Sequence, residues 1–161
     1  MIDIRRAEDS DFEGIWAIFH EVVQAGDTYL YAPGTTREEA RASWMSKDVS
    51  TYVAVLDGEV VGTYILRPNY DGLGSHVANA GYMVKKGAGG RGIGAALCRH
   101  SMEEARRQGF LAMQFNMVVS TNERAVALWQ RMGFAIVGTL PKAFRHSKLG
   151  PVDAYVMHRF L

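Results

Sequence analysis

The segment Val84–Leu97 has the sequence VKKGAGGRGIGAAL and joins a predicted strand to a predicted helix. Four of its glycines lie within Gly87–Gly92. Glycine allows the backbone to turn so that several N–H groups point at one spot, and the N-terminus of a helix adds the positive end of its dipole. Gly92 and Gly94 also leave space for a ligand to approach the main chain, and Arg91 adds positive charge at the rim. The segment therefore predicts a binding site for an anion such as a pyrophosphate.

The same loop has three other interpretations. A glycine-rich turn that binds no ligand is the simplest, because short glycine patterns also arise by chance. A dinucleotide-binding fold is disfavoured, because the strands before the loop form antiparallel hairpins rather than a leading strand–helix–strand unit. A nucleotide-binding P-loop is excluded, because no Gly-Lys-Ser or Gly-Lys-Thr follows the glycines.

Runs of β-branched, aromatic and alternating apolar residues around this segment predict seven strands. Asp57-Gly58 separates two of them and predicts a tight hairpin. Gly81 lies inside another strand, which indicates a bulge or the close approach of another group to the backbone. The predicted strands are Ile2–Arg6, Thr51–Leu56, Glu59–Leu66, His76–Lys85, Leu111–Val119, Phe134–Leu140 and Val152–Phe160.

Apolar residues at helical spacing predict four helices. Ser10 with Glu13, and Thr36 with Glu39, have the spacing of a capping box at the start of the first two helices. Glycines follow the third and fourth helices and suit their C-terminal ends. The helical patterns cover Phe12–Val23, Thr36–Ser46, Arg91–Arg107 and Ala125–Met132.

The order of these elements predicts an α/β protein of the mixed α+β type. The early strands are expected to pair as antiparallel neighbours, while a strand–helix–strand crossover in the middle makes one pair parallel. We expect a central mixed, mostly antiparallel sheet of about seven strands with helices on both faces. The chain of 161 residues has the length of one domain, so residues 1–161 are expected to form a single domain.

The composition excludes several classes of protein. Lys and Arg number 18 and Asp and Glu number 17, so the net charge of +1 gives no support for a nucleic-acid or membrane partner. The only cysteine, Cys98, forms no disulfide within the chain and fits a reducing cytoplasm. The first residues form no apolar signal segment, and no uncharged run is long enough to cross a bilayer. We therefore expect a cytoplasmic protein.

Three features in a fixed order resemble the GNAT superfamily of acetyl-coenzyme A-dependent N-acetyltransferases. The loop Gly89–Gly94 is similar to the family pattern Gln/Arg-x-x-Gly-x-Gly/Ala. The strand Tyr82–Val84 stands immediately before it, and Asn122–Phe134 is similar to Asn-x-x-Ala-x-x-Leu-Tyr-x-x-x-Gly-Phe. The resemblance covers essentially the whole chain and implies the GNAT fold, with acetyl-coenzyme A as co-substrate and no metal.

In this family the pantetheine arm of the coenzyme runs between two splayed parallel strands, which here would be His76–Lys85 and Leu111–Val119. Main-chain groups of the first strand bind the arm and polarise the thioester carbonyl. The amides of the glycine loop hold the pyrophosphate. Asn122 bonds the arm near the sulfur and also suits a helix N-cap. The implied cofactor contacts are Tyr82, Met83, Val84, Gly89, Gly90, Arg91, Gly92, Ile93, Gly94, Ala95 and Asn122.

The chain departs from the family pattern at three positions. Gly89 replaces the first Gln or Arg of the loop, so one side-chain contact is lost while the amide groups remain. Trp129 replaces the Tyr that often protonates the leaving thiolate, and an indole delivers no proton at neutral pH. Met117 stands where many members place a Glu as base. Direct attack by the amine, with water carrying the proton, is therefore the simplest mechanism.

The segments His76–Tyr82 and Phe115–Asn122 resemble the small-molecule branch that acetylates azetidine-2-carboxylate, related amino or imino acids, and phosphinothricin-type substrates. In that branch an Asn on the strand and the Asn that opens the later helix contribute to the site. The resemblance thus implies catalytic roles for Asn79 and Asn122. Asn79 can hold a carboxylate or orient an amine, and it can equally bond only to neighbouring backbone.

Three more residues are candidates for binding the acceptor. Thr28 and Tyr29 lie in a loop on the side where this superfamily binds its substrates, although plain loop packing explains them as well. Arg145 can meet a substrate carboxylate, or it can be a solvated surface charge. No spacing of His, Asp or Glu suggests a metal site.

These features predict an N-acetyltransferase that moves acetyl from acetyl-coenzyme A to the amine of a small molecule, an amino acid or an analogue. Two alternatives stay open. One is acetylation of a protein N-terminus or of a lysine. The other is a non-catalytic acetyl-coenzyme A-binding sensor, which the missing Tyr and Glu suggest. Homodimers are frequent in this superfamily, so a homodimer is compatible with the resemblance.

Overall fold

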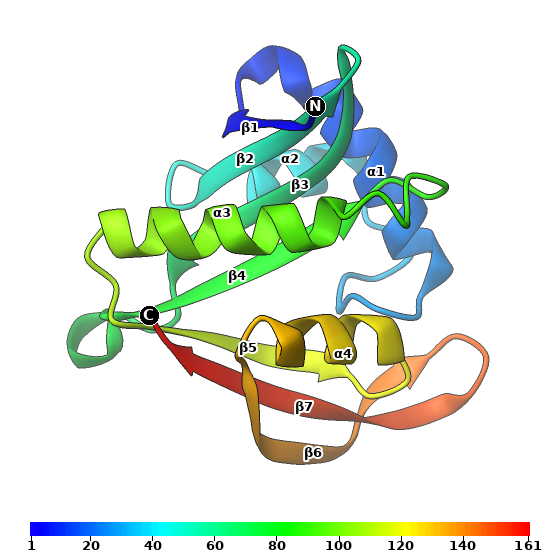
Figure 1. Ribbon diagram of the computed structural model, residues 1–161. Coiled ribbons are helices and arrows are strands. Elements are labelled where there is room, and N and C mark those ends of the chain that lie inside the picture. Colours follow the sequence, from blue (N-terminus) through cyan, green and yellow to red (C-terminus); the bar gives the residue numbers. More distant parts are fainter.

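The computed structural model describes all 161 residues and contains one seven-stranded sheet and four α-helices (Figure 1). All the predicted strands and helices are present, with changes at their ends. The strands are β1 (Asp3–Arg6), β2 (Ser50–Leu56), β3 (Glu59–Pro68), β4 (Val77–Val84), β5 (Ala112–Val119), β6 (Ala135–His146) and β7 (Gly150–Phe160). The α-helices are α1 (Phe12–Ala25), α2 (Arg37–Trp44), α3 (Ile93–Arg107) and α4 (Glu123–Arg131), and short 3-10 helices cover Asp9–Asp11 and Gly72–Gly74.

The strands are arranged in the order β1-β2-β3-β4-β5-β7-β6. Every neighbouring pair is antiparallel except β4 and β5, which are parallel because the chain returns through α3 between them. The predicted β2–β3 hairpin turns at Asp57-Gly58, where φ is 51° and 80°. The prediction of a mixed, mostly antiparallel sheet is confirmed.

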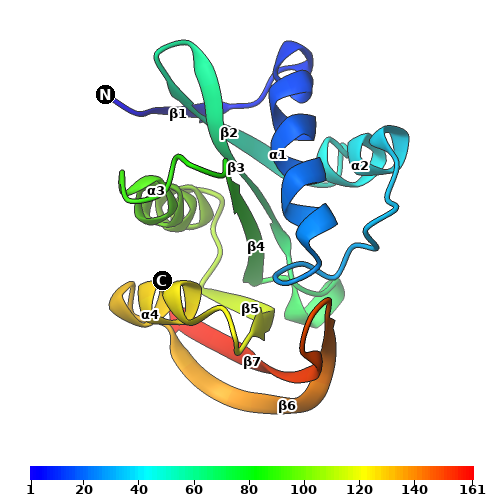
Figure 2. The same ribbon diagram turned by 90° about the vertical axis from the view of Figure 1, so that its right-hand side faces the viewer.

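Helices cover both faces of the sheet, as predicted. α1 and α2 lie on one face, and α3 and α4 lie on the other (Figure 2). Phe19 and Trp44 belong to the buried apolar cluster on the first face, and Leu97 and Met113 belong to the larger cluster on the second. None of the helices combines the length and the apolar character that crossing a bilayer requires. Because both faces are covered, a ligand reaches the central main chain most easily where two strands separate.

Of the two capping boxes that the sequence predicts, one forms and the other does not. Thr36 and Glu39 form the predicted capping box, with Thr36 N donating to Glu39 Oε2 at 2.8 Å and Glu39 N to Thr36 Oγ1 at 3.2 Å. The box predicted for Ser10 and Glu13 was wrong. Glu8 and Asp11 form a box two residues earlier, in which Asp11 Oδ2 accepts from Glu8 N at 2.7 Å.

Glycine geometry sets the bounds of α3. Its first residue is Ile93 rather than the predicted Arg91, because Gly92 has the left-handed φ of 73° and cannot lie inside the helix. Gly109 has a φ of 88° and follows the helix end, as predicted. The glycine loop therefore meets α3 at Gly92.

The penultimate strand is longer than predicted. β6 runs to His146 instead of ending at Leu140, because the strand resumes after a register shift between Leu140 and Phe144. Lys142 lies in this irregular stretch with a φ of 49°, and its N–H donates to Asp153 Oδ1 at 2.9 Å. A bulge of this kind leaves little trace in a hydrophobic pattern.

Candidate functional site

The sheet divides between its two parallel strands. β4 and β5 pair only at Val77–Ala112, Ala78–Met113 and Asn79–Gln114. Beyond Asn79 they diverge (Figure 1), and β5 carries a register shift between Phe115 and Val118 where it pairs with β7. We call the opening between the later residues of β4 and those of β5 the fork. The fork confirms the splayed strands that the family resemblance implied.

Main-chain groups of β4 point into the fork at alternate residues. Asn69 N donates to Val77 O at 2.8 Å and Lys85 N to Val61 O at 2.9 Å, so the odd-numbered residues of this strand face β3. Because backbone groups alternate sides along a strand, those of Tyr82 and Val84 face the fork. Met83 pairs with Thr63 and faces β3 instead. Unpaired strand groups of this kind are ready to bind an extended ligand.

The glycine loop places free amides at the start of α3. Ala96 N donates to Gly92 O at 2.9 Å and is the first N–H bonded within this helix. The amides of Ile93, Gly94 and Ala95 therefore have no helical acceptor, and no side chain caps them. A Cβ at Gly92 would meet no protein atom within 4 Å, so among the protein's own contacts it is the backbone conformation that requires glycine here.

Positive charge surrounds this loop on more than one side. Arg91 is exposed beside it. Lys85 forms an ion pair with Glu59, which partly offsets its charge. The Arg124 guanidinium lies 4.0 Å from the position that a Cβ on Gly89 would take. Sequence reasoning missed Arg124, and the available signal was its place in the first turn of the helix that Asn122 opens.

Asn122 lies where α4 begins. Its Oδ1 accepts from Ala125 N at 3.4 Å, so the structure confirms the N-cap interpretation. Its own N–H donates to Val119 O at 3.0 Å, which ties the helix start to the end of β5. Its side-chain nitrogen has no acceptor within the protein, which leaves that donor available to a ligand at the open end of the fork.

Asn79 lies at the point where the fork begins. Its Nδ2 donates to the Gln114 carbonyl oxygen at 3.0 Å, across the last pair of the β4–β5 ladder. The chain of amides continues from Gln114 Nε2 to Asn116 Oδ1 at 2.9 Å and from Asn116 Nδ2 to Asn69 Oδ1 at 2.7 Å. Asn69 Nδ2 is buried and has no partner. Asn79 thus bonds to neighbouring backbone, as one of its two predicted interpretations holds. Its position at the base of the fork is also compatible with the other interpretation, a role in binding the substrate.

Tyr29 reaches the fork from the loop after α1. Its hydroxyl donates to the Tyr82 carbonyl oxygen at 3.0 Å. A Cβ on Gly81 would lie 2.8 Å from the Tyr29 oxygen, so the close approach that Gly81 predicted is confirmed. Burial raises the pKa of Tyr29 well above its usual value, so the phenol stays neutral. The neighbouring Thr28 is half-buried.

Arg145 makes no hydrogen bond or ion pair with a residue of the fork. It lies in β6 opposite Pro151 and is exposed, rather than in the loop where it was predicted. The nearby hairpin tip is tied to the end of α1, because Ser147 N donates to Gly26 O at 2.9 Å and Ser147 Oγ to Ala25 O at 2.8 Å. This hairpin and the loop of Tyr29 therefore lie side by side (Figure 2).

The two unusual positions of the family pattern hold apolar side chains. The Trp129 ring packs against Tyr82 at 4.9 Å and against Phe115 at 5.1 Å between centroids. Met117 lies half-buried in the irregular part of β5. Neither side chain titrates, so neither can exchange a proton with a substrate.

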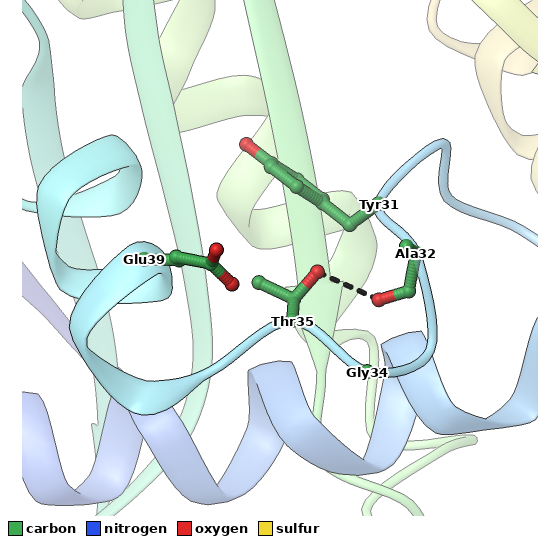
Figure 3. A pocket seen from close by; sticks show the side chains of 5 residues that line it. All are labelled: Tyr31, Ala32, Gly34, Thr35 and Glu39. Atoms are coloured by element: carbon green, nitrogen blue, oxygen red, sulfur yellow. Dashed lines mark hydrogen bonds between the residues drawn. The ribbon is translucent and has the colours of Figure 1, made fainter.

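A separate shallow depression lies between the loop after α1 and α2 (Figure 3). Its polar groups are used locally: Thr35 Oγ1 donates to Ala32 O at 2.6 Å, and Glu39 takes part in the capping box. It is lined by Tyr31, Ala32, Gly34, Thr35 and Glu39. The polar side chains of this depression are therefore bonded to their own neighbours and are not arranged as a catalytic site.

Comparisons with known proteins agree with this geometry. Residues 12–134 match the model of the acetyltransferase (GNAT) family. The structure of a GCN5-related N-acetyltransferase from Kribbella flavida is 48% identical, covers 99% of this chain and 98% of its own, and superposes with a TM-score of 0.95. An L-amino acid N-acetyltransferase, AaaT, from Escherichia coli is 30% identical over 98% of this chain and 97% of its own length. N-acetyltransferase aca1 from Schizosaccharomyces pombe is 36% identical over 60% of this chain, which spans only 47% of that protein.

Proposed function

Because the chain belongs to the acetyltransferase (GNAT) family, we propose that it transfers an acetyl group from acetyl-coenzyme A to the amine of a small molecule, an amino acid or a close analogue. The observation that carries this proposal is the pairing of β4 and β5, which stops at Asn79–Gln114 and leaves a fork beside the free amides of α3. The L-amino acid N-acetyltransferase that resembles the chain over nearly its full length supports the substrate class.

The residues around the fork fit acetyl-coenzyme A, which supplies the acetyl group as a thioester. We propose that the amides of Gly89, Gly90, Arg91, Gly92, Ile93, Gly94 and Ala95 hold its pyrophosphate. A helix N-terminus attracts such an anion, and Arg91 and Arg124 add charge. The extended arm lies along the main chain of Tyr82, Met83 and Val84, where Tyr82 and Val84 offer groups that face the fork. Asn122 donates to the arm from the start of α4.

The acceptor amine attacks the thioester directly. Its neutral nitrogen forms a bond to the acetyl carbon as the carbon–sulfur bond breaks, the nitrogen then gives one of its two protons to water, and the coenzyme A thiolate takes a proton from water. Trp129 and Met117 play no part in these transfers, because neither titrates. The main-chain N–H of Tyr82 stabilises the negative charge that develops on the thioester oxygen.

We place the acceptor on the α1 side of the fork. Asn79 lies at its base, Tyr29 reaches its edge, and Thr28 is next to Tyr29 in the same loop. Asn79 keeps one of its two side-chain N–H groups on the Gln114 carbonyl oxygen, and its own oxygen is the acceptor that we propose for an amine. Arg145 is the candidate for the carboxylate of an amino acid. We further propose a reducing, cytoplasmic location, which the single unpaired Cys98 supports.

A coenzyme-release assay tests this function. The protein is mixed with acetyl-coenzyme A and one amine at a time, and free thiol is followed with a colorimetric reagent. The amines are the proteinogenic L-amino acids, azetidine-2-carboxylate, L-methionine sulfone and a short peptide with a free N-terminus and a lysine. Turnover of free amino acids supports the proposal, and turnover of the peptide alone would favour a protein acetyltransferase. Tight binding of acetyl-coenzyme A without any turnover would favour a sensor.

A further inference from the structure

Tyr29 is the side chain that brings a hydroxyl to the main chain of the fork. We propose that its phenolic oxygen accepts an N–H of the attacking amine and so holds the nucleophile over the thioester. The inference rests on the proposed function and deepens it, because it names the group that orients the acceptor in a chain whose usual Tyr and Glu are replaced. Tyr29 would be a substrate-contacting residue supplied by a loop rather than by α4.

The hydroxyl lies at the part of β4 where chemistry is expected. Tyr82 is three residues beyond Asn79, the last residue of β4 that pairs with β5. Its carbonyl oxygen faces the fork and accepts from the Tyr29 hydroxyl at 3.0 Å. The neighbouring N–H of the same residue is the group proposed to polarise the thioester. A nucleophile bonded to the Tyr29 oxygen is therefore delivered close to the carbon that it attacks.

The ring of Tyr29 is held on several sides. It stacks on Tyr31 with centroids 6.0 Å apart, and meets Trp44 edge to face at 6.1 Å. Gly81 provides the space, because its missing Cβ would stand 2.8 Å from the Tyr29 oxygen but 3.7 Å from the ring carbon that carries it. The hydroxyl oxygen is thus the only atom of the Tyr29 side chain that a Cβ at Gly81 would displace.

The chemistry of the phenol favours acceptance over proton transfer. A hydroxyl has one hydrogen to donate and two lone pairs to accept. The Tyr29 hydroxyl donates its one hydrogen to the Tyr82 carbonyl oxygen. Burial raises the pKa of Tyr29, so the group neither gives up its proton to a thiolate nor takes one as a phenolate. What remains is acceptance of one N–H from a neutral amine, which leaves the nitrogen lone pair free to attack.

The first test compares Tyr29→Phe with Tyr31→Phe. Both variants keep their rings, but the Tyr31 hydroxyl contacts Ser43 Oγ at 3.0 Å, away from β4. We expect kcat/KM for the best amino acid of the release assay to fall about tenfold in Tyr29→Phe, the loss typical of one hydrogen bond. The dissociation constant of acetyl-coenzyme A, measured by calorimetry, is expected to stay unchanged. Tyr31→Phe is expected to behave as the wild type.

The second test introduces Gly81→Ala into two proteins, the wild type and the Tyr29→Phe variant. The new methyl group displaces the Tyr29 hydroxyl in the wild type, but meets only ordinary contacts once the oxygen is gone. Gly81→Ala should therefore lower kcat/KM about as much as Tyr29→Phe does, and add little to it in the double variant. Equal damage in both backgrounds, or full activity of Tyr29→Phe, would overturn the inference while the proposed function stands. A wild type that acetylates no amine would overturn both.

Discussion

Gly92 is the residue on which the anion site depends most directly. It is exposed, a Cβ on it would touch nothing, and yet its φ of 73° belongs to the left-handed region. The conformation of this one residue turns the chain so that the next amides begin α3 with their N–H groups free. An alanine here costs about 1–2 kcal/mol if the turn is kept, so the turn is expected to relax instead.

We therefore predict that Gly92→Ala weakens acetyl-coenzyme A binding about tenfold or more, measured by calorimetry. Gly138→Ala is the matched control, because Gly138 also has open space but an ordinary φ. Binding that is equally strong in both variants would mean that the loop does not hold the coenzyme.

The residues that contact the acceptor are harder to predict from the sequence than the residues of the glycine loop. Gly81 indicated either a bulge or the close approach of another group to β4, and the structure shows the close approach. The glycine did not indicate which group. Tyr29 and Tyr82 are 53 positions apart, and their contact depends on how the loop after α1 folds over Trp44. No local pattern encodes that path, so Tyr29 was placed on the substrate side only through the family resemblance.

At the scale of elements, the first two helices begin differently. The start of α2 follows its predicted capping box, whereas the start of α1 depends on Asp11, whose carboxylate makes two separate interactions. α2 begins at the box of Thr36 and Glu39. Ahead of α1, the Asp11 carboxylate both accepts from the Glu8 backbone N–H and pairs with Arg5 at 2.7 Å, and the helix begins after it. Thr36→Ala should lower the free energy of unfolding by about 1 kcal/mol in urea titrations, whereas Ser10→Ala should leave it unchanged. The reverse order of effects would refute this assignment of the caps.

The junction of β1 and α1 also makes stability depend on pH. The hydrogen bond from Arg5 holds the pKa of Asp11 below its usual value, despite the opposing effect of burial. A lowered pKa in the folded state stabilises the fold above the unfolded-state pKa, and the benefit disappears as pH falls through the folded-state pKa. The wild type should exceed Asp11→Asn in unfolding free energy near pH 6, and the difference should shrink at about pH 3. A difference that is the same at both pH values would contradict this role.

The sequence predicted which strands and helices form more reliably than it predicted the residues at which they begin and end. Alternation in Leu111–Val119 and the helical stripe of Phe12–Val23 are long patterns, and both elements are present with only their ends changed. β6 was predicted too short, because its continuation passes through Pro141 and a Lys142 with positive φ. Such irregular steps depend on pairing with β7, which no local window of sequence contains.

At the scale of the whole molecule, the sheet is two sets of strands joined by one short parallel ladder. β1 to β4 form one antiparallel set, β5 to β7 form the other, and only three residue pairs connect them. α1 and α2 cover one face while α3 and α4 cover the other (Figure 2). The fork lies where these two sets meet, and the glycine loop lies at its open end because α3 follows β4 directly.

A crystal structure of the protein with acetyl-coenzyme A tests this account most directly. We expect the pyrophosphate on the amides between Gly90 and Ala95, the arm in the fork against Tyr82 and Val84, and the acetyl group within reach of the Tyr29 hydroxyl. A coenzyme bound away from the fork, or a β4–β5 ladder that closes past Asn79 and excludes it, would contradict the account.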